Sequence, residues 1–319
     1  MVGKKTPYDI MTGSNLPAWL GLSKFKGPNE VLQDAFNDIA GSPPNFIDSN
    51  EAMSWGDTLE PVIAQQASVR LGLSNPQTKH EVAVFHEEWP LAVSLDATID
   101  GNNKDIYTDW KKGVIVMTGD SVKMEGRGCL EIKVTGQEAE DKPALYRGVY
   151  QLQAQMACTN STWGCLAVLY KGTEMRCFIY GIDSDMQNTI KDSSYDFYNR
   201  VEKYRLNEET DWVDMTSPKE ATAIYDEAID KVIDLPTAED HAMEIVALKA
   251  EAKHIYSMIE AKSAEIMQLM KESKIATAGN FTITWPMLNY KAQPEKIIPA
   301  KEAYSIRQSK LRIKQNVKT

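Results

Sequence analysis

Apolar residues in the first seventy positions recur at helical spacing, which predicts three helices before any strand. The first begins after Asn15, which can cap it. The second covers about 28–39 and stops before a Gly-Ser-Pro-Pro turn. The third runs from about Asn50 to Leu71, and Pro61 inside it predicts a bend because proline lacks a backbone donor.

The pattern then changes to the two-residue period of strands. The expected elements, in order, are strands at 81–85, 91–96 and 129–134, a helix at 143–159, strands at 163–170 and 175–180, and a helix at 184–204. Segments 106–107 and 114–116 are possible extra strands. Strands mixed with helices in this way indicate an α/β (α+β) core, with a central mixed sheet flanked by helices.

The rest of the chain has a different pattern, which predicts a second domain. A long helix is expected over about 237–274, with an apolar stripe opposite a charged face, as in a C-terminal helical arm. A short alternating strand, 281–285, and a basic tail from Lys301 follow. We therefore predict a core domain at 1–205 and a helical arm at 206–319.

Amino-acid composition indicates the compartment of the protein more clearly than its function. No apolar run approaches the roughly 18 residues of a membrane span, and no signal sequence is evident at the N-terminus. The four cysteines show no CxxC pair, so a reduced, cytoplasmic location is expected. The formal net charge of −10 counts against a nucleic-acid partner, although a local basic channel is compatible with it.

The strongest candidate for chemistry is Asp96 together with Glu131-Ile132-Lys133. Residues two apart on a strand face the same side, so Glu131 and Lys133 project together. A carboxylate and an ammonium on a half-buried face need partners, and a divalent cation shared by Asp96 and Glu131 would supply one. An exposed strand face is the commoner meaning of such spacing, so other residues must decide.

Three neighbouring features bear on that choice, and each has an ordinary alternative. Glu60 lies on the third helix, where it is equally a solvated carboxylate. Gln151 and Gln155 share one helix face and can reach a water or a phosphate, or form only a polar surface. Gly13-Ser14 precedes a helix, where it suits an anion but also plain capping.

The order of these motifs resembles the YqaJ-type viral recombinases, which are lambda exonuclease-like alkaline nucleases of the PD-(D/E)XK superfamily. The resemblance covers roughly residues 8–200 and rests on five motifs in order: Gly13-Ser14, Trp55-Gly56 with Glu60-Pro61, Ser94-Leu95-Asp96, Glu131-Ile132-Lys133 and Gln151-Leu152-Gln153. It implies a restriction-endonuclease-like core. It also implies a metal-dependent 5′→3′ exonuclease that digests linear double-stranded DNA and leaves 3′ overhangs.

The resemblance also implies roles for individual residues. Asp96, Glu131 and the backbone carbonyl of Ile132 would bind Mg²⁺ or Mn²⁺, with two ions expected, and Lys133 would activate the attacking water. Further catalytic roles would belong to Glu60, Gln151 and Gln153, and contacts to phosphate to Ser14 and Ser94. The expected partners are DNA ends, a single-strand annealing protein and further copies of the chain in a ring of three or four.

Two features depart from the family pattern. The family usually has Ser-Pro-Asp-Gly where this chain has Ser94-Leu95-Asp96-Ala97, so Asp100 is a rival ligand. The segment 101–128 is long, and its Lys111 and Lys112 are expected to contact DNA or a neighbouring subunit. A non-catalytic scaffold that binds DNA ends and a site-specific endonuclease remain the alternatives.

Overall fold

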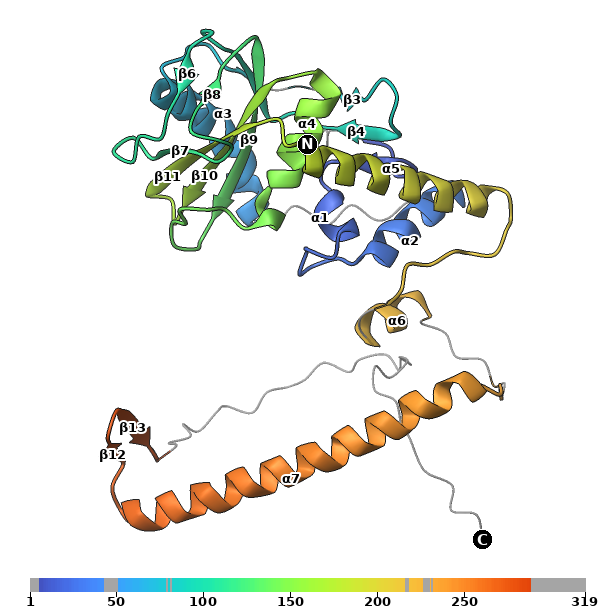
Figure 1. Cartoon of the computed structure of the whole chain (residues 1–319), viewed down its shortest axis with the longest axis vertical. Helices are drawn as coiled ribbons and strands as arrows, with labels where there is room; N and C mark the ends of the chain where they lie inside the picture. Colours follow the sequence, from blue (N-terminus) through green and yellow to red (C-terminus); the bar gives the residue numbers. More distant parts are fainter. Residues whose placement is uncertain are drawn as a thin grey trace, which may run out of the picture. The chain divides into compact units, whose positions relative to one another are not determined.

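The chain forms two compact units, Met1–Ile224 and Tyr225–Thr319, which are coloured by sequence in Figure 1. The computed structural model describes residues 6–42, 51–78, 80, 82–215, 218–225, 230 and 232–287. The expected basic tail from Lys301 lies outside these residues.

A six-stranded mixed sheet is the centre of the first unit (Figure 1). Counted in their spatial order, the third and fourth strands are parallel to each other, as are the fifth and sixth, and the other neighbouring pairs are antiparallel. In spatial order the strands are β2 (Gln77–Thr78), β5 (Ala97–Asp100), β9 (Arg127–Thr135), β10 (Trp163–Tyr170), β11 (Glu174–Gly181) and β7 (Val114–Val116).

Helices cover both faces of this sheet, which confirms the predicted fold class. On one face, α3 (Glu51–Leu71) packs Ile63 and Ala67 against Leu130 and Ile132 of β9. The helices in the core of the other face are α1 (Leu16–Trp19), α2 (Pro28–Ile39), α4 (Val149–Thr159) and α5 (Ser184–Arg205). Because side chains alternate along a strand, Glu131 and Lys133 project to the face that α4 covers.

The strand expected at 91–96 is shorter than predicted, and the chain passes here from one sheet to another. β4 (Leu91–Val93) belongs to a small sheet, between β1 (Met11–Thr12) and β3 (Val84–Phe85), whereas β5 begins only at Ala97 in the large sheet. Asp96 lies between β4 and β5 along the chain. Its carboxylate oxygen Oδ2 accepts the Ile132 amide at 2.9 Å, so the side chain takes the place of a backbone partner there.

The helix expected over 143–159 begins later, at Val149. A short 3-10 turn, Leu145–Arg147, precedes it, and Gly148 between them has a φ of +104°. A helix cannot pass through a residue in that conformation, which glycine alone adopts readily. Within the segment 101–128, β6 (Asp105–Ile106) pairs with β8 (Val122–Lys123).

A last short helix, α6 (Pro218–Ile224), completes the first unit. It is attached to α2, because the Asn29 side-chain amide of α2 donates to Glu220 at 3.1 Å. The unit therefore extends to Ile224, and the division after residue 205 stays a prediction.

The second unit contains the expected long helix, α7 (Glu239–Met270), after the 3-10 turn Pro236–Ala238. A hairpin of β12 (Ile275–Ala278) and β13 (Phe281–Thr284) follows, so the predicted short strand is confirmed. Among the helices of the described ranges, none has the length and apolar character that crossing a bilayer requires.

Candidate functional site

Two strands and one helix bring the candidate residues together. Ala97 of β5 pairs with Leu130 of β9 in antiparallel register, so Asp96, the preceding residue, lies beside Glu131. Lys133 follows Glu131 on the same face of β9, and α4 lies over that face with Gln151 and Gln155. The cluster of Asp96, Glu131, Lys133, Gln151 and Gln155 is called the carboxylate cluster below.

Glu131 is the buried centre of the carboxylate cluster, with none of its surface exposed. The Gln155 amide donates to Oε2 at 2.6 Å, and Oε1 forms an ion pair with the Lys133 ammonium. Among the described residues, no well-aligned hydrogen bond reaches Oε1. Burial, followed by the negative charge of Asp96, raises the pKa of Glu131 to about 8, although Lys133 opposes the change. Burial and the nearby Asp96 therefore outweigh the stabilising positive charge of Lys133 at this carboxylate.

Lys133 is half-buried beside three carboxylates. Its ammonium donates to Gln151 Oε1 at 3.2 Å in addition to the ion pair with Glu131. Burial alone would lower the pKa of Lys133, but the charges of Glu131, Asp96 and Glu60 outweigh it, so the pKa lies above its ordinary value. Lys133 is thus positively charged at neutral pH. Glu60 on α3 thus acts on Lys133 through its charge, and its catalytic role stays a prediction.

Gly148, which the sequence analysis did not single out, lies against the cluster. A Cβ atom placed there would meet Glu131 Cγ, Lys133 Cε and Leu166 Cδ1, each at 3.2 Å. That distance is too short for ordinary packing. The glycine therefore allows the chain before α4 to approach the two charged side chains closely, and its positive φ starts the helix in the required direction.

Gly148→Ala is expected to destabilise the fold by about 2–4 kcal/mol, because it adds both backbone strain and a crowded methyl group. Gly172→Ala is the matched control, since Gly172 also has a positive φ, of +71°, but nothing lies within 4 Å of its Cβ position. Urea denaturation measures both variants. Equal losses of free energy of unfolding would show that packing against the cluster contributes nothing.

Gln153 is the predicted catalytic residue that the structure places away from the cluster. Its side chain is buried, donates to the Gly181 carbonyl at 2.8 Å and accepts from the Asp183 amide at 3.2 Å. It thereby ties α4 to the turn before α5. Gln155 takes the position near Glu131 and also donates to the Ser94 carbonyl at 2.9 Å. Helical spacing explains this outcome, because Gln151 and Gln155 are four apart and share a face, whereas Gln153 faces elsewhere.

The two serines of the motifs border the cluster. The Ser94 carbonyl accepts the Gln155 bond described above, and the Ser94 side chain is half-buried. Ser14 is exposed, with its hydroxyl 3.2 Å from that of Thr12. The adjoining Gly13 packs close to Gln151, because a Cβ there would lie 3.5 Å from Gln151 Cγ. The Ser94 carbonyl and Gly13 thus contact residues of the carboxylate cluster, and the contacts of both serine side chains to phosphate stay a prediction.

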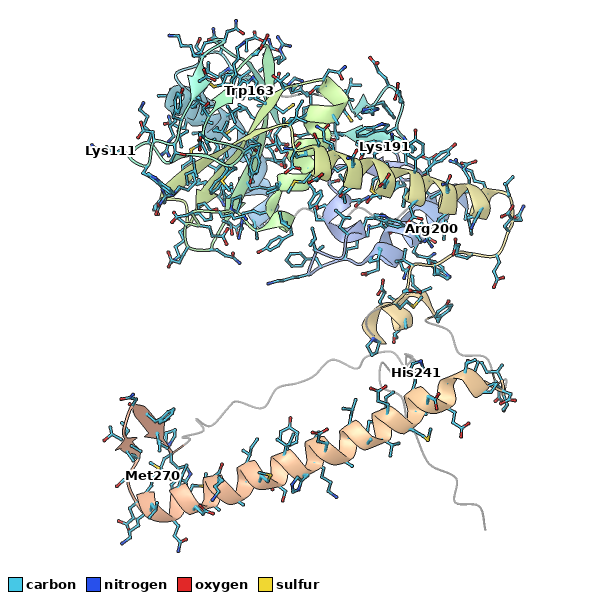
Figure 2. The ribbon with its side chains drawn as sticks, in the orientation of Figure 1. Lys111, Trp163, Lys191, Arg200, His241 and Met270 are labelled. Atoms are coloured by element: carbon cyan, nitrogen blue, oxygen red, sulfur yellow. The ribbon has the colours of Figure 1, made fainter. Side chains whose placement is uncertain are left out.

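Three other predicted residues lie farther away. Asp100, the rival ligand, is exposed and accepts from Arg127 Nε at 2.9 Å, at the far end of β5 from Asp96. Lys111 and Lys112 are exposed in the loop before β7, where Figure 2 labels Lys111 at the tip. β7 is three strands from β9, which corresponds to about 14 Å across the sheet. The two lysines therefore lie away from the carboxylate cluster, and their contact with DNA or a neighbouring subunit stays a prediction.

The carboxylate cluster fits a divalent cation of the oxygen-binding kind. Two carboxylates, of Asp96 and Glu131, lie close enough for one to raise the pKa of the other, and the buried Glu131 Oε1 is approached by the Lys133 ammonium without a well-aligned hydrogen bond. Among the described residues, no group of three His, Cys, Asp and Glu side chains is arranged as a metal site. The set is instead one that Mg²⁺ accepts, since Mg²⁺ is commonly bound by one or two carboxylates and completes its shell with other oxygens.

The solved structures to which the chain is similar include two of one protein, LHK-Exo, and one of a second protein. LHK-Exo in complex with dAMP is 16% identical over 63% of this chain and 95% of its own, with a TM-score of 0.44. The alkaline exonuclease (LHK-Exo) from Laribacter hongkongensis is 17% identical over 62% and 90%, with a TM-score of 0.43. A phage related exonuclease from Haemophilus somnus 129PT is 12% identical over 62% and 96%, with a TM-score of 0.42. No curated protein matches the chain.

Comparison with known families gives one match, which covers the part of the chain that contains the carboxylate cluster. Residues 5–162 match the YqaJ-like viral recombinase domain. The matched range includes all five ordered motifs, from Gly13-Ser14 to Gln151-Leu152-Gln153. Residues 5–162 therefore form a YqaJ-like viral recombinase domain, which confirms the family that the sequence motifs resemble.

Proposed function

We propose that the chain is a metal-dependent DNA exonuclease that digests linear double-stranded DNA from 5′ to 3′ and leaves 3′ single-stranded overhangs. The observation that carries the proposal is the convergence of Asp96, Glu131 and Lys133 with Gln151 at one buried position of a YqaJ-like domain. A protein that only binds DNA has no need of two repelling carboxylates and a charged lysine, which are costly to bury.

Asp96 and Glu131, with the backbone carbonyl of Ile132, are the proposed ligands for Mg²⁺ or Mn²⁺. The bound cation would neutralise charge on the phosphate and make a water molecule more acidic. Glu60, whose charge acts on Lys133, is the proposed residue for holding a second ion or a water molecule. Because both cluster carboxylates are tied to neighbours, Asp96 to the Ile132 amide and Glu131 to Gln155, they are held in place before any ion binds.

Lys133 is the proposed group that positions the attacking water and stabilises the charge that develops on phosphate. Its ammonium is held by Gln151 and Glu131, and its raised pKa keeps it protonated at neutral pH. A fixed positive charge at a partly buried site stabilises a developing negative charge more strongly than it would in bulk solvent. Gln151 is a positioning residue, because its contact is with Lys133.

Gln155→Leu tests the support of Glu131. The substitution leaves Glu131 Oε2 and the Ser94 carbonyl without their donor, so we expect a loss of about 1–3 kcal/mol in stability and at least a tenfold lower kcat. Gln153→Leu is the matched control on the same helix, because Gln153 is equally buried and also makes two hydrogen bonds. It should lose similar stability but keep its kcat. Equal effects on kcat would mean that Gln155 acts only through the fold.

The proposed partners are DNA ends, a single-strand annealing protein and other copies of the chain in a ring of three or four. The exposed Lys111 and Lys112 are the proposed contacts to the duplex away from the cut, and Ser14 and Ser94 those to phosphate near it. A bound duplex would therefore extend from the carboxylate cluster toward the loop before β7.

End dependence and polarity are tested with one set of substrates. Purified chain is incubated with Mg²⁺ and a linear duplex labelled at either the 5′ or the 3′ end of one strand, beside the same DNA as a closed circle. We expect early release of the 5′ label, late release of the 3′ label and an intact circle. Cutting of the circle would indicate an endonuclease, and binding without cutting under Mg²⁺ and Mn²⁺ would indicate a scaffold.

A further inference from the structure

The helix α7 in the second unit exposes large apolar side chains along its whole length. Leu248 is 55% exposed, Ile259 54% and Leu269 82%, and within the helix only Met270 is buried. Helices in proteins owe most of their stability to the packing of an apolar face. Exposed apolar surface of this extent is typical of a surface that binds a partner.

The apolar residues follow the alternating spacing of three and four that forms the seam of a coiled coil. The first half of the seam is Ile245, Leu248, Ala252 and Ile255. The second half continues the spacing with Ile259, Lys262, Ile266 and Leu269. The single polar member is Lys262, so seven of these eight seam positions are apolar. The helix is therefore patterned to pack lengthwise against another helix.

The seam is complementary to itself when two copies run in opposite directions. Two copies can pair in opposite directions about a point midway between Ile255 and Ile259. The large residues in the first half of one seam then face the large residues in the second half of the other copy's seam. Ala252, the smallest member, then faces Lys262 of the second copy, whose long aliphatic stem fills the space. A parallel pair would instead place Ala252 against its own copy, which leaves a gap, and Lys262 against Lys262, which brings like charges together.

Charges beside the seam agree with the antiparallel arrangement. The Lys262 ammonium already bonds both carboxylate oxygens of Glu265 on its own helix, at 2.9 and 3.0 Å. When it lies over Ala252 of the second copy, the ammonium is also next to Glu251 of that copy. One lysine is thus placed between two glutamates at each of two symmetric positions, as expected for a twofold interface that uses the same patch on both copies.

We propose that α7 joins two copies of this chain as an antiparallel coiled coil through the seam from Ile245 to Leu269. The interface uses residues of α7, none of which belongs to the carboxylate cluster, and does not depend on nuclease activity. It gives the helical arm a function of its own, the assembly of the protein.

The proposal is tested on the full chain by a distance between spin labels at Met243→Cys. All four native cysteines are buried, so the label is confined to this exposed site. The parent protein, which keeps Met243, is treated with the same label to measure the background. In the antiparallel pair the two labels are separated by about 28 helical residues, or about 42 Å. A parallel pair would give less than about 20 Å, which would overturn the proposal.

Two neighbouring substitutions supply the matched variants. Ile266 is on the seam and 39% exposed, whereas Met267 is off it and 40% exposed. Ile266→Asp is expected to abolish the distance peak, and Met267→Asp to preserve it, with helix content in both checked by circular dichroism. Sedimentation of the parent should give at least twice the 35.8 kDa of one chain. A monomeric parent, or equal effects of the two substitutions, would contradict the proposal.

Discussion

Lys133→Ala is expected to reduce DNA hydrolysis at saturating Mg²⁺ by roughly 10³-fold, with little change in DNA binding. The reason is that Lys133 supplies the only positive charge among the residues of the carboxylate cluster, and fixed charges that stabilise a transition state have effects of about this size. Gel-based assays with a linear duplex measure the rate, and fluorescence anisotropy measures the binding.

Lys191→Ala is the control for that substitution. Lys191 is exposed on α5, where Figure 2 labels it, and it belongs to the same unit. It should retain the parent rate. A folded Lys133→Ala protein that keeps more than a tenth of the parent rate would show that Lys133 is not part of the chemistry.

Glu131→Gln is expected to abolish hydrolysis and also to remove a pH dependence of stability. Without divalent cations, folded Glu131 holds its proton up to about pH 8, whereas the unfolded carboxyl releases it near 4.5. The folded state therefore binds more protons between these values, so the free energy of unfolding falls as pH rises through this window, by on the order of 5 kcal/mol. The glutamine variant has no proton to lose and should not show that fall.

Chemical denaturation at several pH values in the presence of a chelator tests this prediction. Glu138→Gln is the control, because Glu138 is exposed and pairs with Lys171 at the surface. Added Mg²⁺ should flatten the pH dependence of the parent, since a cation bound to the carboxylates favours their charged forms. An identical pH slope in parent and Glu131→Gln would mean that Glu131 is not held protonated in the folded state.

The sequence predicted the strand part of the site well. Glu131 and Lys133 share a face because a strand alternates, and no distant contact is needed to know it. The placement of Asp96 beside Glu131 was different. It depends on the pairing of β5 with β9 across the segment 101–128, which only the family resemblance indicated. Local periodicity also gave a continuous strand over 91–96, whereas the Asp96 side chain ends the pairing.

The helix part of the site was predicted less well, for two physical reasons. The motif directed attention to Gln151 and Gln153, although helical spacing favours Gln155 as the companion of Gln151, and the structure agrees with the spacing. Gly148 had no local signal, because its positive φ and its approach to Glu131 arise from tertiary packing. The apolar spacing of the seam in α7 can be predicted from the sequence. That the seam is complementary to itself becomes evident only when two copies are aligned.

The most direct test of the proposed metal-dependent site compares Asp96→Asn with Asp100→Asn. Both substitutions remove one carboxylate at β5, but Asp96 adjoins Glu131, whereas Asp100 is exposed and paired with Arg127. The measurement is the Mg²⁺-dependent loss of linear duplex DNA, with folding of each variant checked beforehand. We predict that Asp96→Asn loses activity at least a hundredfold and that Asp100→Asn keeps it within a factor of about three. Full activity in Asp96→Asn would contradict the proposed site.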